Sequence, residues 1–299
     1  MRRLLATVVA MGLTAACGVS GGPGGADGRL RVVAAFYPLY EAAERVGGDR
    51  VQVSNLTPAG SEPHALELSS RQVDRIEDAA VLLFLGRGFQ PALEKAAARA
   101  KGTKVDLLAG LENLRPGGAG EEALEVDPHV WLDPLQQKAI VAQVARALAG
   151  ADPANRAYYE ANAEAYSREL DDLDAAFTRG LAQCERRVLV TAHAAFGYLA
   201  ARYGLTQEAI AGLEPESEPS PQRLADLTAK VRASGTTTIF YETLVSPKVA
   251  QALAREAGVG TAVLDPVEGL TERERKAGRT YLSAMRENLE AIRAALECR

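Results

Sequence analysis

The sequence predicts an α/β protein with two similar lobes, each holding a parallel sheet flanked by helices, joined by one long rigid helix. Short apolar segments rich in β-branched residues alternate with segments of helical spacing in both halves of the chain. The two halves repeat this order, each with a proline-rich loop at the corresponding place. Between them, residues 153–183 carry apolar side chains at helical spacing and no proline after Pro153. A chain of 299 residues is also long enough for two domains.

The first half is expected to contain four strands, at 30–36, 51–56, 80–85 and 104–108. Each is a short, mainly apolar run, which is typical of a strand buried on both faces of a parallel sheet. Helices are predicted between them at 38–47, 69–78 and 90–100. The first helix is expected to end at the Gly47-Gly48 pair. The order of these elements favours a parallel sheet with helices on both faces.

The second half is expected to repeat the arrangement, with strands at 187–191, 208–212, 237–241 and 260–264. Its helices are predicted at 194–203, 222–233 and 247–257, with a last helix at about 279–296. The linking segment 153–183 is interpreted as one helix, roughly 40 Å long at 1.5 Å per residue. Two helices with a break near Asp171 are the alternative.

The predicted division of the chain has five parts. It runs as a signal peptide (1–16), a tether (17–29), a first lobe (30–152), a linking helix (153–183) and a second lobe (184–299).

The N-terminus indicates export and anchoring. Arg2 and Arg3 precede an uncharged apolar run that ends at Ala16 and is too short to span a membrane. Because Ala-Ala-Cys-Gly closes it, the run resembles a bacterial lipoprotein signal, with cleavage before Cys17 and lipid on its thiol. The alternative is an ordinary signal peptide with a chance cysteine. A glycine-rich run at 18–28 then serves as a flexible tether. We expect an extracytoplasmic protein held at the outer face of the cytoplasmic membrane, at the cell surface or in the periplasm.

The net charge limits the possible binding partners, and the cysteine content bears on the redox state of the compartment. A net charge of −5 argues against nucleic acid or an anionic membrane surface as a partner. Beyond Cys17, the chain has two cysteines, Cys184 and Cys298. An even pair in an oxidising compartment favours a disulfide, and two free buried thiols are the alternative.

The segment 127–134 (DPHVWLDP) predicts a stiff loop that holds His129 in one direction. Two Asp-Pro steps enclose that histidine and Trp131, and proline restricts both its own backbone and that of the residue before it. A firmly held imidazole is what a metal site requires. The simpler interpretation is a proline-bounded turn with a structural histidine and a packed tryptophan.

All three histidines of the chain follow predicted strands. His64 and His129 follow strands of the first lobe, while His193 and Asp265 stand just past strands of the second. In open parallel sheets, ligands bind outside the carboxyl ends of the strands. Three imidazoles and one carboxylate form a nitrogen-rich set suited to tetrahedral Zn²⁺.

Several runs of the sequence are similar to the metal-binding receptors of bacterial zinc and manganese ABC transporters, the cluster A-I solute-binding proteins. They are GSEPH at 60–64, DPHVWLDP at 127–134, VTAHAAFGY at 190–198, the segment 242–247 and VLDP at 263–266. The resemblance covers about residues 30–297. It implies a monomeric receptor whose His64, His129, His193 and Asp265 hold a metal between two lobes. Such a receptor delivers its ion to a membrane permease that works with an ATPase subunit.

Two further acidic residues lie in or beside the sequence runs that carry the resemblance. Glu62 and Glu242 could each ligate the ion, but a supporting or solvated role is favoured. Zinc is favoured over manganese because His193 is an imidazole where manganese-type relatives carry a carboxylate.

Three other functions compete with the zinc receptor: a manganese receptor of the same family, a zinc hydrolase and an adhesin with incidental metal. The chain has no HExxH run, and four protein ligands would leave no position for an activated water. We therefore expect a receptor rather than an enzyme.

Overall fold

The computed structural model describes residues 28–118 and 124–299. The predicted signal peptide, Cys17 and nearly all of the predicted tether lie outside the described residues. No helix in the described part of the chain is long and apolar enough to cross a membrane.

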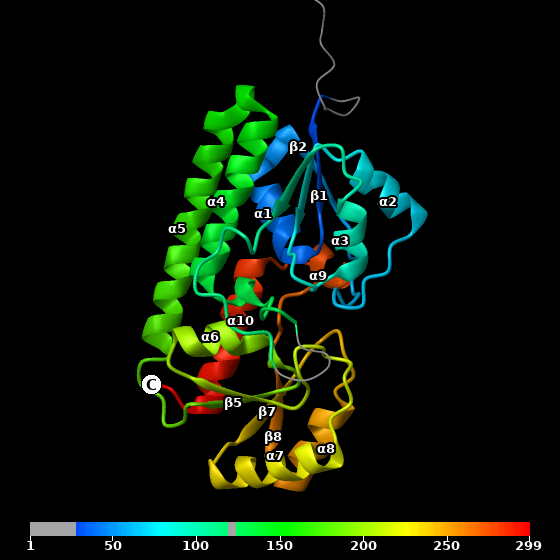
Figure 1. Cartoon of the computed structure of the whole chain (residues 1–299). Coiled ribbons are helices and arrows are strands. Elements are labelled where there is room, and N and C mark those ends of the chain that lie inside the picture. The colour runs from blue at the N-terminus through cyan, green and yellow to red at the C-terminus, as the bar shows by residue number, and fades with distance from the viewer. Residues whose placement is uncertain (1–27, 119–123) are drawn as a thin grey trace, which may run out of the picture.

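Two four-stranded parallel sheets form the centres of the two lobes (Figure 1). The strands of the first sheet are β1 (Leu30–Ala34), β2 (Val51–Asn55), β3 (Val81–Phe84) and β4 (Thr103–Asp106). Those of the second are β5 (Val188–Thr191), β6 (Thr206–Ala209), β7 (Thr238–Tyr241) and β8 (Gly260–Val263). The strand orders, β2-β1-β3-β4 and β6-β5-β7-β8, are the same topology twice. The predicted fold class and the repeat are confirmed.

Ten α-helices in the described residues flank the sheets or join the lobes. They are α1 (Tyr37–Gly47), α2 (Ser70–Glu77), α3 (Pro91–Ala97), α4 (Pro134–Ala151), α5 (Arg156–Gly180), α6 (Gly197–Arg202), α7 (Pro221–Ala233), α8 (Lys248–Ala257), α9 (Glu272–Lys276) and α10 (Tyr281–Leu296). In the first lobe, α1 and α4 lie on one side of the sheet and α2 and α3 on the other (Figure 1).

The linking helix α5 is unbroken through Asp171, so the prediction of one helix is confirmed and the alternative with a break is wrong. It begins after a 3-10 turn at Pro153–Asn155 and is roughly 37 Å long at 1.5 Å per residue. Its buried residues alternate in steps of three and four. The helix lies alongside α4 (Figure 1). Helix α4 was not predicted; Asp133 caps its first turn and Pro134 stands at its first position.

The second sheet is shared between two cores. Leu189 and Phe240 on one face join a large core that also contains the first sheet, α4, α5 and α10. Val190 and Ile239 on the other face pack with α7 and α8 in a small separate core. The inner face of the second lobe is therefore continuous with the first lobe, while its outer layer is not.

A disulfide joins Cys184 and Cys298, as predicted. The backbone on either side is also paired, since the Arg186 amide donates to the Leu296 carbonyl at 3.2 Å. The end of α10 is thereby tied to the segment that leads into β5.

Candidate metal centre

His64 lies in the loop that follows β2. The side-chain amide of Gln90 donates to the Pro63 carbonyl at 2.9 Å, and the Glu62 carboxylate accepts from the His64 amide at 3.1 Å. The imidazole also packs edge-on against Phe89, with ring centroids 4.8 Å apart. These contacts aim the ring towards the space between the lobes.

His129 stands immediately before a 3-10 turn, Val130–Leu132, in the predicted stiff loop. Asp127 Oδ1 accepts from the His129 amide at 3.0 Å and lies 2.8 Å from the ring Nδ1. Because this carboxylate holds Nδ1, Nε2 is the ring nitrogen that faces the centre. The side chain is fully buried, with Trp131 packed beside it.

His193 is held in the same way in the second lobe. It follows β5 by two residues, and Glu242 Oε1 lies 2.7 Å from its Nδ1 and 3.2 Å from its backbone amide. Glu242 thus contacts a histidine of the cluster through the ring nitrogen that points away from the centre. Asp127 plays the equivalent part for His129 and was not singled out in the sequence.

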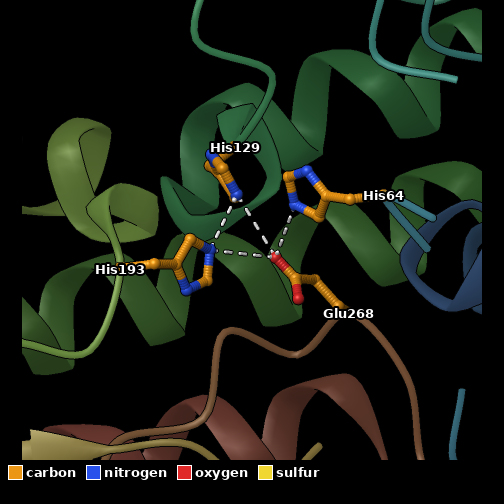
Figure 2. A group of neighbouring side chains, drawn as sticks. All are labelled: His64, His129, His193 and Glu268. Carbon is orange, nitrogen blue, oxygen red and sulfur yellow. Dashed lines mark hydrogen bonds and ion pairs between the residues drawn. The ribbon is translucent and has the colours of Figure 1, made fainter. Parts of the chain in front are cut away.

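Glu268 completes the cluster, and its Oε1 lies among the three imidazoles (Figure 2). This oxygen is 3.4 Å from His64 Nε2, 3.2 Å from His129 Nε2 and 3.5 Å from His193 Nε2. The four residues are buried, and their potential ligand atoms lie within 4.8 Å of one another.

Asp265 is placed elsewhere, which corrects the expectation that it faces the histidines. Its Oδ2 forms an ion pair with Arg279 Nη1 at 2.8 Å, and its Oδ1 accepts from the Val267 amide at 2.7 Å. The chain turns after Asp265, so the carboxylate three residues later reaches the cluster instead. The sequence did contain a signal, because Glu268 is a second acid in the same short loop.

Two further acids lie beside His64. The Glu62 side chain is 9% exposed, with Oε1 3.9 Å from His64 Nε2 and Oε2 without a hydrogen-bond partner among the described residues. Glu214, from the second lobe, approaches His64 Nδ1 to 3.4 Å. Burial and the charge of Glu268 raise the pKa of Glu62 to about 8. Burial lowers the pKa of His64, but its contacts with Glu214 and Glu268 outweigh this effect and raise the pKa to about 9.

The central carboxylate is held in its ionised form. Burial alone would raise the pKa of Glu268, but hydrogen bonds from the three imidazoles lower it well below the ordinary value. Burial also opposes protonation of His193, yet Glu242 and Glu268 raise the pKa of that imidazole well above its ordinary value. The cluster therefore pairs bound protons with carboxylates, and a divalent cation would replace those protons.

The spacing of the donor atoms fits a small tetrahedral ion. Metal–ligand bonds of about 2.0–2.1 Å place neighbouring ligands of a tetrahedron roughly 3.3 Å apart. The three Glu268 distances are 3.2–3.5 Å, and His129 Nε2 and His193 Nε2 are 3.2 Å apart. Three nitrogens and one oxygen match the ligands of a zinc site, and these four distances match its dimensions.

Known proteins are similar to this chain in sequence and in structure. A family model described as ZnuA, zinc-uptake complex component A, periplasmic, matches residues 32–295. The zinc-binding lipoprotein AdcA of Streptococcus pneumoniae is 40% identical over 280 residues, which cover 90% of this chain and 56% of AdcA. The chain thus spans about half the length of that relative.

Two comparisons cover nearly all of the matched protein. The high-affinity zinc uptake system protein ZnuA of Bacillus subtilis is 35% identical over 301 residues, covering 95% of this chain and 94% of that protein. The crystal structure of the Zn(II)-bound ZnuA-like domain of Streptococcus pneumoniae AdcA matches with 39% identity and a TM-score of 0.79. That match covers 90% of this chain and 100% of the domain. The resemblance to bacterial metal receptors is thus confirmed, and the chain belongs to the ZnuA family.

Proposed function

We propose that this protein is an extracytoplasmic zinc receptor of an ABC transporter. It binds one Zn²⁺ between its lobes through His64, His129, His193 and Glu268 and delivers the ion to a membrane permease. The observation that carries the proposal is the convergence of three imidazole Nε2 atoms on Glu268 Oε1 at tetrahedral spacing. The names of the two relatives, a zinc-binding lipoprotein and a zinc uptake protein, support it.

The ligand chemistry favours zinc over manganese. Manganese prefers oxygen ligands and higher coordination numbers, whereas zinc accepts four ligands with several imidazoles. His193 supplies a nitrogen at a fully buried position, and Glu242 orients its ring. Neither the family description nor the names of these relatives is that of a hydrolase.

Metal titration of a soluble form that starts at Gly28 tests the site. The metal-free protein should bind one zinc ion per chain and melt at a higher temperature with zinc, because the ion stabilises only the folded state. Glu268→Ala should weaken zinc affinity at least about 100-fold, more than the loss typical of a residue that only supports a ligand. Glu216→Ala is the control, because that acid is exposed on the loop beside His64. No zinc-dependent shift, or full affinity in Glu268→Ala, would contradict the proposal.

Metal selectivity is tested at His193. His193→Glu replaces a nitrogen ligand with oxygen, so zinc affinity should fall much more than manganese affinity. Equal losses for the two metals would show that His193 is not a ligand. A strain that lacks the protein should grow poorly under zinc depletion, and a defect confined to manganese depletion would contradict the zinc assignment.

We further propose that residues 1–16 are removed and that lipid on Cys17 holds the mature protein through the 17–29 tether. The two lobes, at 30–152 and 184–299, are then presented outside the cytoplasmic membrane on either side of the 153–183 link. The name of the pneumococcal relative, a lipoprotein, supports this anchor. Cys17→Ser should release the protein into the soluble fraction. Retention of that variant in membranes would indicate a different anchor.

A further inference from the structure

Several backbone groups of the loop that carries Glu268 are held by hydrogen bonds. Asn288 of α10 accepts from the Asp265 amide at 2.9 Å and donates to the Asp265 carbonyl at 2.6 Å. Trp131 of the first lobe donates its indole N–H to the Pro266 carbonyl at 2.7 Å. The loop is therefore held by α10 on one side and by the opposite lobe on the other.

Within this loop, Val267 has an unusual backbone conformation. Its φ is +56°, in the left-handed region that β-branched residues rarely adopt, and its side chain is fully buried. Such a conformation persists only where the surroundings enforce it. Asp265 Oδ1 contributes by accepting from the Val267 amide at 2.7 Å, which closes the turn that places Glu268.

Arg279 holds the other oxygen of Asp265. Its Nη1 is 2.8 Å from Asp265 Oδ2, with the two side chains 14% and 3% exposed. The same guanidinium binds Glu274 of α9 at 2.5 Å and Glu287 of α10 at 2.7 Å. Three carboxylates thus fix the arginine between the two helices. The ion pair keeps the Asp265 carboxylate turned away from the three histidines.

We propose that Arg279 is a positioning residue that makes Glu268, rather than Asp265, the metal-facing carboxylate of this loop. The inference rests on the proposed zinc site. Without Arg279, the buried Asp265 would be an uncompensated charge, which proteins strongly disfavour. A metal ion bound by the three histidines would then attract it. The turn at Val267 would lose one of its supports, and Glu268 would no longer be held in one position facing the histidines.

The test uses a double-mutant cycle in the soluble form from Gly28. Arg279→Met should weaken zinc affinity about 10–100-fold, the range for residues that orient a metal ligand. Glu268→Gln should cost much less affinity in the Arg279→Met background than in the wild type, because Glu268 is already displaced there. The matched control is Arg275→Met, since Arg275 forms an exposed pair with Glu272 in α9. It should leave zinc affinity unchanged.

Two further variants separate positioning from general support of the fold. Arg279→Lys should recover part of the affinity, because an ammonium can still face Asp265 but cannot bind three carboxylates in the same fork. Asp265→Asn added to Arg279→Met should also recover affinity, since it removes the freed charge and retains an acceptor for the Val267 amide. The visible spectrum of bound Co²⁺ should change in Arg279→Met and return towards wild type in this double variant.

The outcomes are distinguishable. If wild-type protein binds no zinc, or Glu268→Gln has no effect in it, the zinc site itself is wrong. If Glu268 matters but Arg279→Met keeps wild-type affinity and Co²⁺ spectrum, the positioning role is wrong. Additive losses in the cycle, with no recovery by Asp265→Asn, would also overturn it, because Arg279 would then act on the fold alone. Should Arg279→Met fail to fold, the same comparisons in Arg279→Lys decide the matter.

Discussion

Each lobe supplies two residues to the cluster. One of the two is held in the same way in both lobes, and the other is held differently. In each lobe, a fully buried histidine has its Nδ1 held by a carboxylate of its own lobe, Asp127 for His129 and Glu242 for His193. The remaining ligands have no such symmetry. His64 faces Glu214 of the opposite lobe, whereas a loop anchored to α10 and Trp131 holds Glu268.

Both of these ligands depend on the opposite lobe. His64 of the first lobe contacts Glu214 of the second, and the Glu268 loop of the second lobe is held by Trp131 of the first. The Glu214 side chain is partly exposed, whereas Trp131 is fully buried. We therefore expect the contact at His64 to be the weaker of the two.

The largest expected effect concerns the disulfide that stabilises the second lobe. The bridge spans 114 residues, and in the chain-entropy model its loss costs about 4–5 kcal/mol of unfolding free energy. Denaturant unfolding of Cys184→Ser/Cys298→Ser should show this loss. Zinc affinity should change little, because neither cysteine belongs to the cluster of His64, His129, His193 and Glu268. Free thiols in the denatured, unreduced wild type, or unchanged stability in the variant, would argue against the bridge.

The next effect is a pH dependence of stability that arises at Asp265, in the loop that carries Glu268. Burial raises the pKa of Asp265 to about 6 in spite of Arg279. Because the folded state keeps this proton where the unfolded chain has lost it, stability is greater at low pH and falls as pH rises through 6. The contribution is about 3 kcal/mol at 1.36 kcal/mol per pKa unit.

Asp265→Asn should lack this component. Unfolding of the metal-free proteins between pH 4 and pH 7 should therefore show a steeper loss of stability in the wild type than in the variant. Parallel curves would mean that Asp265 does not titrate in this range.

In each lobe a carboxylate holds the Nδ1 of one histidine, and this shared feature predicts two similar, smaller losses of zinc affinity. Asp127→Asn and Glu242→Gln should each weaken zinc affinity about 10–100-fold, because each loosens the orientation and lowers the basicity of one imidazole. Glu208→Gln is a suitable control, since that acid pairs with Lys230 at the surface. Competition with a chelator measures all three, and a large loss in only one lobe would contradict the equivalence.

The smallest effect is expected at the contact between lobes. The Glu214 side chain is 33% exposed, so its attraction to His64 is screened by solvent. Glu214→Gln should weaken zinc affinity less than about fivefold, the range of a partly exposed ion pair. Stopped-flow release of zinc should become faster in this variant if the contact helps to hold the lobes closed. A loss as large as that of Glu242→Gln would show that His64 is fixed as firmly as His193.

By itself, the sequence determined the two-lobed fold and the three histidines of the cluster. Strands buried on both faces require unbroken apolar runs, so β1 and β5 were predicted to within two residues at either end. The histidines follow strand ends, and parallel topology brings such positions to one edge of each sheet. Export and anchoring through Cys17 remain predictions from local pattern.

Only the tertiary structure decided which acid faces the histidines. Asp265 and Glu268 are carboxylates three residues apart in one loop, and no local pattern distinguishes them. The choice depends on Arg279 and Asn288 from the segment around α10 and on Trp131 from the other lobe. Asp127 was recognisable as a support only from its contact with the His129 ring. For Glu242 the sequence favoured a supporting or solvated role, and only the structure shows that it holds the His193 ring. Such contacts join residues far apart in sequence, and the burial and hydrogen bonding that fix them exist only once both lobes are packed together.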